Sequence, residues 1–183
     1  MSSRFERVAS ETKYEGKIFS VVEETFRHED GEDSTREIVR HQGAVGVVAH
    51  DGERIYLVRQ PREAIGVPDL LEIPAGKLDV DGESPLQTAR RELAEEIGQE
   101  AEHWEAVISY FPSSGYTDEV VHVFAATDLH PSDVKPDPHE RIEVVRWPLD
   151  DLDGAIQESR DAKTIVGLQW LKLRLMPGHK RDL

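Results

Sequence analysis

The chain has 183 residues, a formal net charge of −15 at pH 7 and no cysteine. This length predicts one domain with room for a small appended subdomain. The lack of cysteine excludes disulfides and thiolate metal sites, so a metal would need oxygen or imidazole ligands, and carboxylates suit Mg²⁺ or Mn²⁺. The negative charge, with no dense basic run before Lys180-Arg181, argues against nucleic acid and anionic membranes as partners.

The N-terminal residues 1–6 contain no apolar stretch of the kind that secretory signals carry. No apolar run in the chain approaches the ~20 residues needed to span a bilayer. We therefore expect a soluble cytoplasmic protein.

The first forty residues predict β structure. Strands are expected at 17–22 and 35–40, and the polar stretch 28–33 between them is typical of a turn, so the two strands should form an antiparallel hairpin. We assign residues 1–42 to a small N-terminal β subdomain, 43–178 to the main domain and 179–183 to a tail.

The main domain begins with an apolar run that is typical of a buried strand, at 43–49. A turn at 51–52 leads to a strand at 54–60, which we expect Pro61 to end. The remaining elements are, in order, a strand at 70–74, a loop at 75–83, a helix at 85–97, strands at 105–109, 120–125 and 142–147, and a helix or helix pair at 149–175. This order predicts a mixed sheet with helices on both faces.

The helix at 85–97 has clear ends. Ser84 is a good N-cap, Pro85 suits the first helical position, and Gln87 completes a possible capping box. Gly98 is a natural C-terminal stop. An apolar face made of Leu86, Ala89, Leu93 and Ile97 should pack on the sheet.

Three glutamates, Glu92, Glu95 and Glu96, crowd one side of this helix, because positions three and four apart are neighbours. They could form a solvated acidic face, since such repulsion costs only ~0.2–0.5 kcal/mol per pair. They could instead share divalent metal ions, which can clamp both the attacking and the leaving oxygen of a displacement. Arg91 can reach Glu95 at i+4 and hold its rotamer, as a metal-binding helix requires.

A longer pattern favours the metal-binding interpretation. From Gly76 the chain reads G-x6-E-x7-R-E-L-x-E-E-x-G, with Glu83 at the second position and Gly98 at the last. It resembles the Nudix box, G-x5-E-x7-R-E-U-x-E-E-x-G-U, where U is bulky and apolar. Chance agreement at seven fixed positions is roughly one in ten million per start site. One extra loop residue before Glu83 and Gln99 in place of the last apolar position are departures, and neither removes a ligand.

The resemblance covers roughly residues 13–175. It implies an α/β fold, the Nudix-type α/β/α sandwich with a mixed β-sheet, and a metal-dependent hydrolase of a nucleoside diphosphate linked to another group. It implies Mg²⁺, with Mn²⁺ possible and two or more ions in each site. It also implies a homodimer in which the N-terminal strands embrace the partner.

The resemblance assigns metal-binding roles residue by residue. Glu92 and Glu96 match the principal metal ligands, and Glu95 matches an accessory acidic position. The main-chain oxygen of Ala75, just before the loop, resembles a further metal ligand of the ADP-ribose pyrophosphatase branch. We count Glu95 and Arg91 among the catalytic residues as well.

Three stretches outside the box also resemble the ADP-ribose branch, at 43–62, 71–77 and 115–119. Arg59 and Arg62 offer planar donor forks to phosphate oxygens, although strand-end arginines can serve solubility alone. We place Gln60 beside them. Glu72 could accept a hydrogen bond from a ribose hydroxyl or an adenine amine.

In the third stretch Tyr116 could stack on a ring, with Asp118 and Glu119 completing the predicted substrate-binding set. The alternative for this stretch is a plain hairpin turn. Two residues depart from the pattern of the branch: Ser114 stands where proline is usual, and Pro61 stands where an aromatic residue is common. These departures weaken the substrate assignment more than the catalytic assignment.

A base is needed to activate water, and in this branch it is a glutamate on a late loop. Glu140 lies at a loop end before a strand, a typical place for a functional residue. Glu143 lies inside the strand and is the second candidate. His139 is a third, because the pKa of histidine suits base chemistry.

The expected reaction is hydrolysis of ADP-ribose to AMP and ribose 5-phosphate. Alternative substrates are another nucleoside diphosphate sugar, FAD, NADH or coenzyme A. A catalytically silent Nudix domain that binds nucleotides as a sensor is an alternative of another class. The intact trio of glutamates argues against it, because a pure binder has no need of their repulsion.

Overall fold

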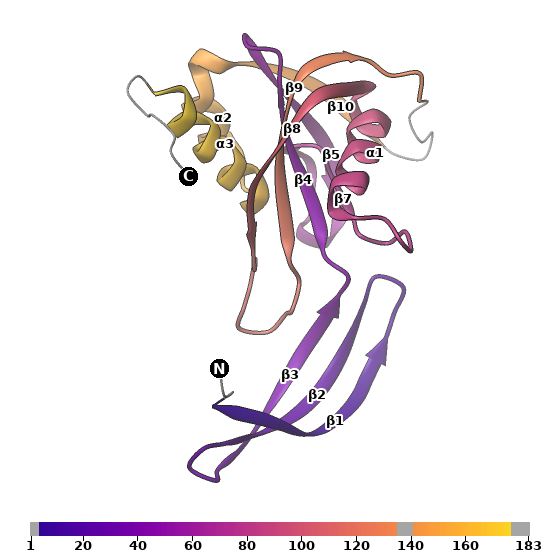
Figure 1. Cartoon of the computed structure of the whole chain (residues 1–183), viewed down its shortest axis with the longest axis vertical. Helices are drawn as coiled ribbons and strands as arrows, with labels where there is room; N and C mark the ends of the chain where they lie inside the picture. Colours follow the sequence, from indigo (N-terminus) through magenta and orange to yellow (C-terminus); the bar gives the residue numbers. More distant parts are fainter. Residues whose placement is uncertain (1–3, 135–140, 177–183) are drawn as a thin grey trace. The chain divides into compact units, whose positions relative to one another are not determined.

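The computed structural model describes residues 4–134 and 141–176. The chain forms two compact units, one made of residues 1–43 and 111–120, the other of residues 44–110 and 121–183 (Figure 1). No helix in the described ranges is long and apolar enough to cross a membrane.

The first unit is a three-stranded antiparallel sheet with the order β1 (Phe5–Glu15), β2 (Phe19–His28) and β3 (Asp33–His41). The predicted turn at 28–33 is confirmed, but sequence reading missed β1. Its register shifts twice, between Arg7 and Ala9 and between Thr12 and Tyr14, and these irregularities break the period-two pattern that identifies a strand.

The second unit is built on a seven-stranded sheet. Its strands are β4 (Ala44–His50), β5 (Arg54–Arg62), β6 (Val67–Glu72), β7 (Ala75–Lys77), β8 (Gln99–Tyr110), β9 (Val121–Pro131) and β10 (Glu143–Pro148). The order is β10-β5-β4-β9-β8, with β6 beside β5 and β7 beside β4. Strands β4 and β9 are parallel while the other pairs are antiparallel, so the predicted mixed sheet is confirmed.

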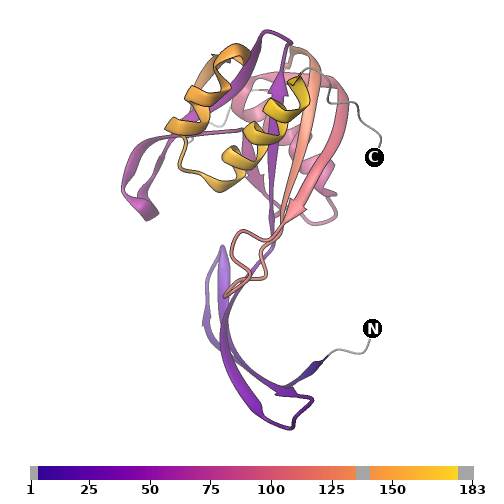
Figure 2. The ribbon, with the colours of Figure 1, turned by 90° about the vertical axis from the view of Figure 1, so that its left-hand side faces the viewer.

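Helices cover both faces of this sheet. Helix α1 (Pro85–Ile97) packs on one face, against a core that includes Val47 and Ala126. Helices α2 (Leu152–Glu158) and α3 (Ala162–Leu175) pack on the other face, against a core that includes Val48 and Val123. Figure 2 shows α2 and α3 in front of the sheet. The α/β/α sandwich predicted from the sequence is therefore confirmed.

Several predicted boundaries in the main domain were wrong. Pro61 does not end its strand, because β5 runs on to Arg62 through a register shift between Gln60 and Arg62, and such an irregularity tolerates proline. The predicted loop at 75–83 contains β7, and β8 begins at Gln99 rather than at residue 105. Short 3₁₀ turns at Glu63–Ile65 and Leu149–Asp151 complete the described elements.

Candidate active site

Helix α1 starts and stops where its sequence predicts. Ser84 accepts a hydrogen bond from the backbone of Gln87, whose side chain in turn accepts one from the Ser84 backbone, so the capping box is complete. Gly98 ends the helix in the left-handed region at φ 64°. These two local devices set the position along the sheet at which the glutamates of α1 project.

Two of those glutamates turn inward and lie against the backbone of β7. Glu92 and Glu96 are only 8% and 6% exposed. Glu96 Oε2 accepts a hydrogen bond of 2.9 Å from the backbone nitrogen of Ala75. A Cβ at Gly76 would lie 2.0 Å from the Glu92 carboxyl carbon, so only glycine lets that carboxylate approach so closely. The two carboxylates therefore converge on adjacent backbone positions.

Arg91 gathers the acidic groups around it. Its Nη1 donates to Glu92 at 2.7 Å and to Glu95 at 3.0 Å, and its Nε lies 3.3 Å from Glu83. The predicted contact between Arg91 and Glu95 is thus present. Burial acts to lower the pKa of Arg91, but the charges of Glu92, Glu95 and Glu83 outweigh it and raise the pKa well above the ordinary arginine value.

The carboxylates of Glu92 and Glu96 fit a hard divalent cation that takes its remaining ligands from other groups. Within 4–134 and 141–176, no three histidine, aspartate or glutamate side chains form a ready metal cage. Mg²⁺ does not need one, because it commonly binds one or two carboxylates and takes its other oxygens from water and substrate phosphates. Glu92 and Glu96 supply that number of carboxylates, and Arg91 fixes the rotamer of Glu92 from outside.

A second charged cluster surrounds Glu72, at the end of β6. Its side chain is fully buried, and both oxygens accept hydrogen bonds from Arg62, from Nε at 2.6 Å and from Nη2 at 2.8 Å. Lys163 Nζ lies 2.5 Å from the same carboxylate. Burial acts to raise the pKa of Glu72, but its bonds to Arg62 and Lys163 prevail and lower it.

Arg62 connects the two clusters. The bond to Glu72 raises the pKa of Arg62, and the charge of Glu96 contributes to the same shift. Arg62 thus carries a positive charge near the carboxylates of α1, and its side chain keeps 40% of its surface exposed. A guanidinium that is fixed by hydrogen bonds to a buried carboxylate can donate further hydrogen bonds to a phosphate oxygen.

Sequence reasoning missed Lys163 and its neighbour Asp161. Asp161 caps α3 by accepting from the backbone of Thr164, and it also contacts Lys163 Nζ at 2.9 Å. The N-cap pattern before α3 could have located the start of this helix. It could not have placed Lys163 beside Glu72, which is 91 residues away in the chain.

The other predicted residues of β5 and β10 have varied settings. Arg59 pairs with Glu158 and donates to the Asp69 carbonyl. Gln60 Nε2 is shielded and has no hydrogen-bond partner among the described residues. Glu143 begins β10 as an exposed residue paired in register with Arg59. Glu140 and His139 lie outside the described residues.

The predicted residues at 116–119 belong to the first unit. The segment lies beside β3, where Val39 donates its backbone N–H to Tyr116 at 2.8 Å. Asp118 accepts from Arg40 at 2.9 Å and from the His41 backbone at 3.0 Å, while Glu119 lies 3.6 Å from the His41 ring. Tyr116 is 57% exposed. Asp118 therefore anchors this segment to β3 and leaves the ring of Tyr116 accessible.

Comparisons with known proteins agree with this arrangement. The family described as NUDIX domain matches residues 40–168. An ADP-ribose pyrophosphatase of Bacillus subtilis (strain 168) is 38% identical over 172 residues, which cover 91% of this chain and 92% of that protein. A methanol dehydrogenase activator of Bacillus methanolicus is 36% identical over 178 residues, 94% of this chain and 95% of that protein. A crystal structure of an ADP compounds hydrolase has the same fold, with a TM-score of 0.82 and 22% identity over 94% of this chain and 95% of its own.

Proposed function

The chain belongs to the NUDIX family and is a hydrolase, and from this premise we propose that it hydrolyses ADP-ribose to AMP and ribose 5-phosphate. The observation that carries the proposal is the convergence of Glu92 and Glu96 on the backbone of residues 75 and 76, next to the positive charge of Arg62. Carboxylates for a divalent cation and a fixed guanidinium are the two charged elements that a pyrophosphate requires.

We assign the metal-binding role to Glu92, Glu96 and the main-chain oxygen of Ala75, with Glu95 as an accessory group. The family generally uses divalent metal ions, and we propose Mg²⁺, with Mn²⁺ as a substitute and two or more ions in each site. Such ions neutralise the pyrophosphate and lower the pKa of water. Arg91 holds Glu92 and Glu95 in place, so that these side chains need not reorganise as the substrate binds.

The phosphate-binding role falls to Arg62, with Glu72 and Lys163 behind it. Glu72 was predicted to contact ribose or adenine, but Arg62 and Lys163 already bind its two oxygens, so we propose that it acts on the substrate through Arg62. Arg59 and Gln60 lie on the same strand and complete the set. Tyr116, Asp118 and Glu119 remain our candidates for contacts with the base and ribose.

The proton-accepting role is assigned to one of two glutamates. Glu140 is the first candidate, on the family resemblance alone. Glu143 is exposed at the start of β10, where its carboxylate can meet solvent. Either group would accept a proton from the attacking water, and each can be tested separately.

The first unit supports the proposal of a homodimer. Strand β1 is exposed along its whole length, and the described residues of the first unit contain no helix. The exposed large apolar side chains between residues 5 and 19 are Phe5, Val8, Tyr14, Ile18 and Phe19. A sheet of three strands needs a packed apolar face for stability, and we propose a second copy of the chain as the covering surface. Light scattering of the purified chain should give twice the monomer mass, and a monomer would refute this part.

The decisive experiment is product analysis across a panel of ADP-ribose, another nucleoside diphosphate sugar, FAD, NADH and coenzyme A. We expect ADP-ribose to have the highest kcat/KM with Mg²⁺, and turnover to stop in excess chelator and return with Mg²⁺ or Mn²⁺. Full turnover in chelator would exclude the metal mechanism. Binding of ADP-ribose without turnover in any divalent metal would favour the silent sensor instead.

A further inference from the structure

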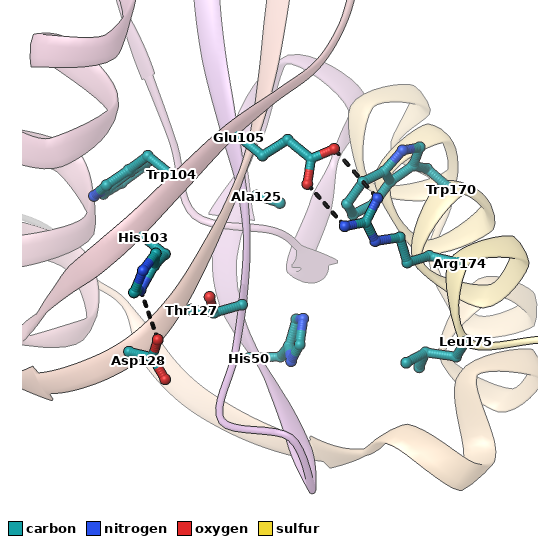
Figure 3. A pocket seen from close by; sticks show the side chains of 10 residues that line it. All are labelled: His50, His103, Trp104, Glu105, Ala125, Thr127, Asp128, Trp170, Arg174 and Leu175. Atoms are coloured by element: carbon teal, nitrogen blue, oxygen red, sulfur yellow. Dashed lines mark hydrogen bonds and ion pairs between the residues drawn. The ribbon is translucent and has the colours of Figure 1, made fainter. Parts of the chain in front are cut away.

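The second unit contains a cavity on the face of the sheet opposite to α1. It has a volume of about 630 Å³ and lies between β4, β9 and β8 on one side and the last turns of α3 on the other (Figure 3). The carboxylate cluster lies with α1 on the other face, so the cavity takes no part in the proposed reaction. Its volume falls in the range of cavities that hold small organic molecules, about 300–1,000 Å³.

The floor of the cavity changes from apolar to polar along the sheet. Val48 and Ala125 are partners in the register of β4 and β9, and Val48 packs in the core beneath α3. Two residues further along, the same face carries His50 from β4 and Thr127 from β9, with His103 of β8 paired to Thr127. These side chains do not fill the space under the end of α3.

One wall of the cavity is a fixed guanidinium. Arg174 contacts Glu105 through both terminal nitrogens, at 3.3 and 3.1 Å, across the gap between helix and strand. Its carbon Cζ also lies 5.5 Å from the ring centroid of Trp170, one turn earlier on α3. A guanidinium held in this way is planar and rigid, and its remaining face can stack on a flat ring.

The imidazole ring of His50 lines the floor of the cavity. His50 Nδ1 is shielded from solvent and makes no hydrogen bond within residues 4–134 and 141–176. Because Nδ1 is shielded, a ligand in the cavity would meet His50 at its other ring nitrogen, Nε2. Burial lowers the pKa of His50, so the ring is neutral at pH 7 and offers one donor and one acceptor.

The charges around the cavity define the ligand further. Glu105 neutralises Arg174, and Asp128 lies 2.6 Å from His103, so the cavity has no excess positive charge for a phosphate. We propose that this cavity binds a neutral, planar nitrogen heterocycle of nucleobase size, stacked on Arg174 and hydrogen-bonded to His50. This site is separate from the proposed active site, and its existence does not depend on the substrate assignment.

The test is a titration of the full-length ¹⁵N-labelled chain, followed by NMR, with nicotinamide as the probe. Nicotinate is the matched probe, because it has the same shape but carries a negative charge. We expect saturable shifts at Thr127, Ala125 and the Trp170 indole, with a dissociation constant of about 1 mM or lower, which fragments of this size can reach. Nicotinate should bind at least about tenfold more weakly, because the carboxylates nearby repel it.

Two variants on the last turn of α3 provide a matched pair. Arg174 and Lys172 both pair with a carboxylate and have side chains 34% and 35% exposed, but only Arg174 lines the cavity. Arg174→Met should weaken nicotinamide binding about tenfold or more, whereas Lys172→Met should leave it unchanged within about twofold. Thr127→Leu, which fills the floor, should abolish the shifts.

Three results would overturn the proposal. The first is the absence of saturable shifts at the cavity residues. The second is equal binding of nicotinamide and nicotinate, and the third is equal weakening by Arg174→Met and Lys172→Met. A melting curve of each variant establishes that it is folded. If Thr127→Leu does not fold, the comparison of Arg174→Met with Lys172→Met tests the proposal.

Discussion

The carboxylate site can be tested at a residue that carries no functional group, Gly76. In Gly76→Ala the new methyl group would lie 2.0 Å from both the carboxyl carbon and Oε1 of Glu92. Carbon atoms that are not bonded rest about 3.5–4.0 Å apart, so the carboxylate must move by about 1 Å or more. Because a displacement of about 1 Å can reduce a rate about 100-fold, we expect that loss in turnover, ~2.7 kcal/mol in the barrier.

The assay measures AMP release from ADP-ribose with Mg²⁺, together with the free energy of unfolding of each variant. Gly76→Ala should lower the stability of the otherwise unchanged chain by about 1–3 kcal/mol, the usual cost of overpacking. In a Glu92→Ala background the methyl group has no carboxylate to meet, so the same change should cost much less. Near-normal turnover of Gly76→Ala, or equal losses of stability in both backgrounds, would refute the reasoning.

Two further predictions concern the charges themselves. Glu96→Gln keeps the size of the side chain but removes a charge, so turnover should fall about 100-fold or more, while the melting temperature in chelator should hold or rise as repulsion is relieved. Near-normal turnover would contradict its role as a ligand. Glu140→Gln and Glu143→Gln separate the candidate bases: the variant of the true base should lose about 100-fold in turnover, keep its affinity for substrate and recover partly at high pH. We expect the larger loss of turnover in Glu140→Gln. A larger loss in Glu143→Gln would assign the base to β10. If each variant loses less than about tenfold in turnover, neither glutamate is the base.

Local features of the fold could be predicted from the sequence. Both ends of α1 were placed correctly, because the capping box and the left-handed glycine depend on residues within a few positions of each other. Strand β4 was found because its buried residues form a short apolar run. Strand β1 was missed because each register shift moves its side chains to the other face.

The candidate site was predictable only where its residues are close in the chain. The spacing on α1 predicts that Glu92 and Glu96 lie together. It does not predict that the Glu92 carboxylate occupies the space left by the missing side chain of Gly76. Lys163 carries no motif, and its contact with Glu72 arises only because α3 packs back on β6. Contacts between distant segments depend on the whole fold, which short patterns do not encode.

The buried carboxylate of Glu72 predicts a specific dependence of stability on pH. The pKa of Glu72 is lowered in the folded chain, so its ionised form contributes stability above the unfolded value of about 4.3 and loses it as pH falls through the folded value. Glu72→Gln removes the negative charge that Arg62 and Lys163 share, and Lys163 keeps its contact with Asp161. Breaking a buried ion pair costs about 3–5 kcal/mol, and we expect about 2–3 kcal/mol at pH 7, because the Arg62 side chain is 40% exposed and keeps part of its hydration.

Urea unfolding at pH 7, 5, 4 and 3 should show that the difference in the free energy of unfolding between the unchanged chain and Glu72→Gln shrinks below about pH 4.3. The control, Glu102→Gln, removes a carboxylate that is 71% exposed and should change stability by less than about 0.5 kcal/mol throughout. A difference for Glu72→Gln that stays constant or grows as the pH falls would mean that the charge of Glu72 does not stabilise the fold.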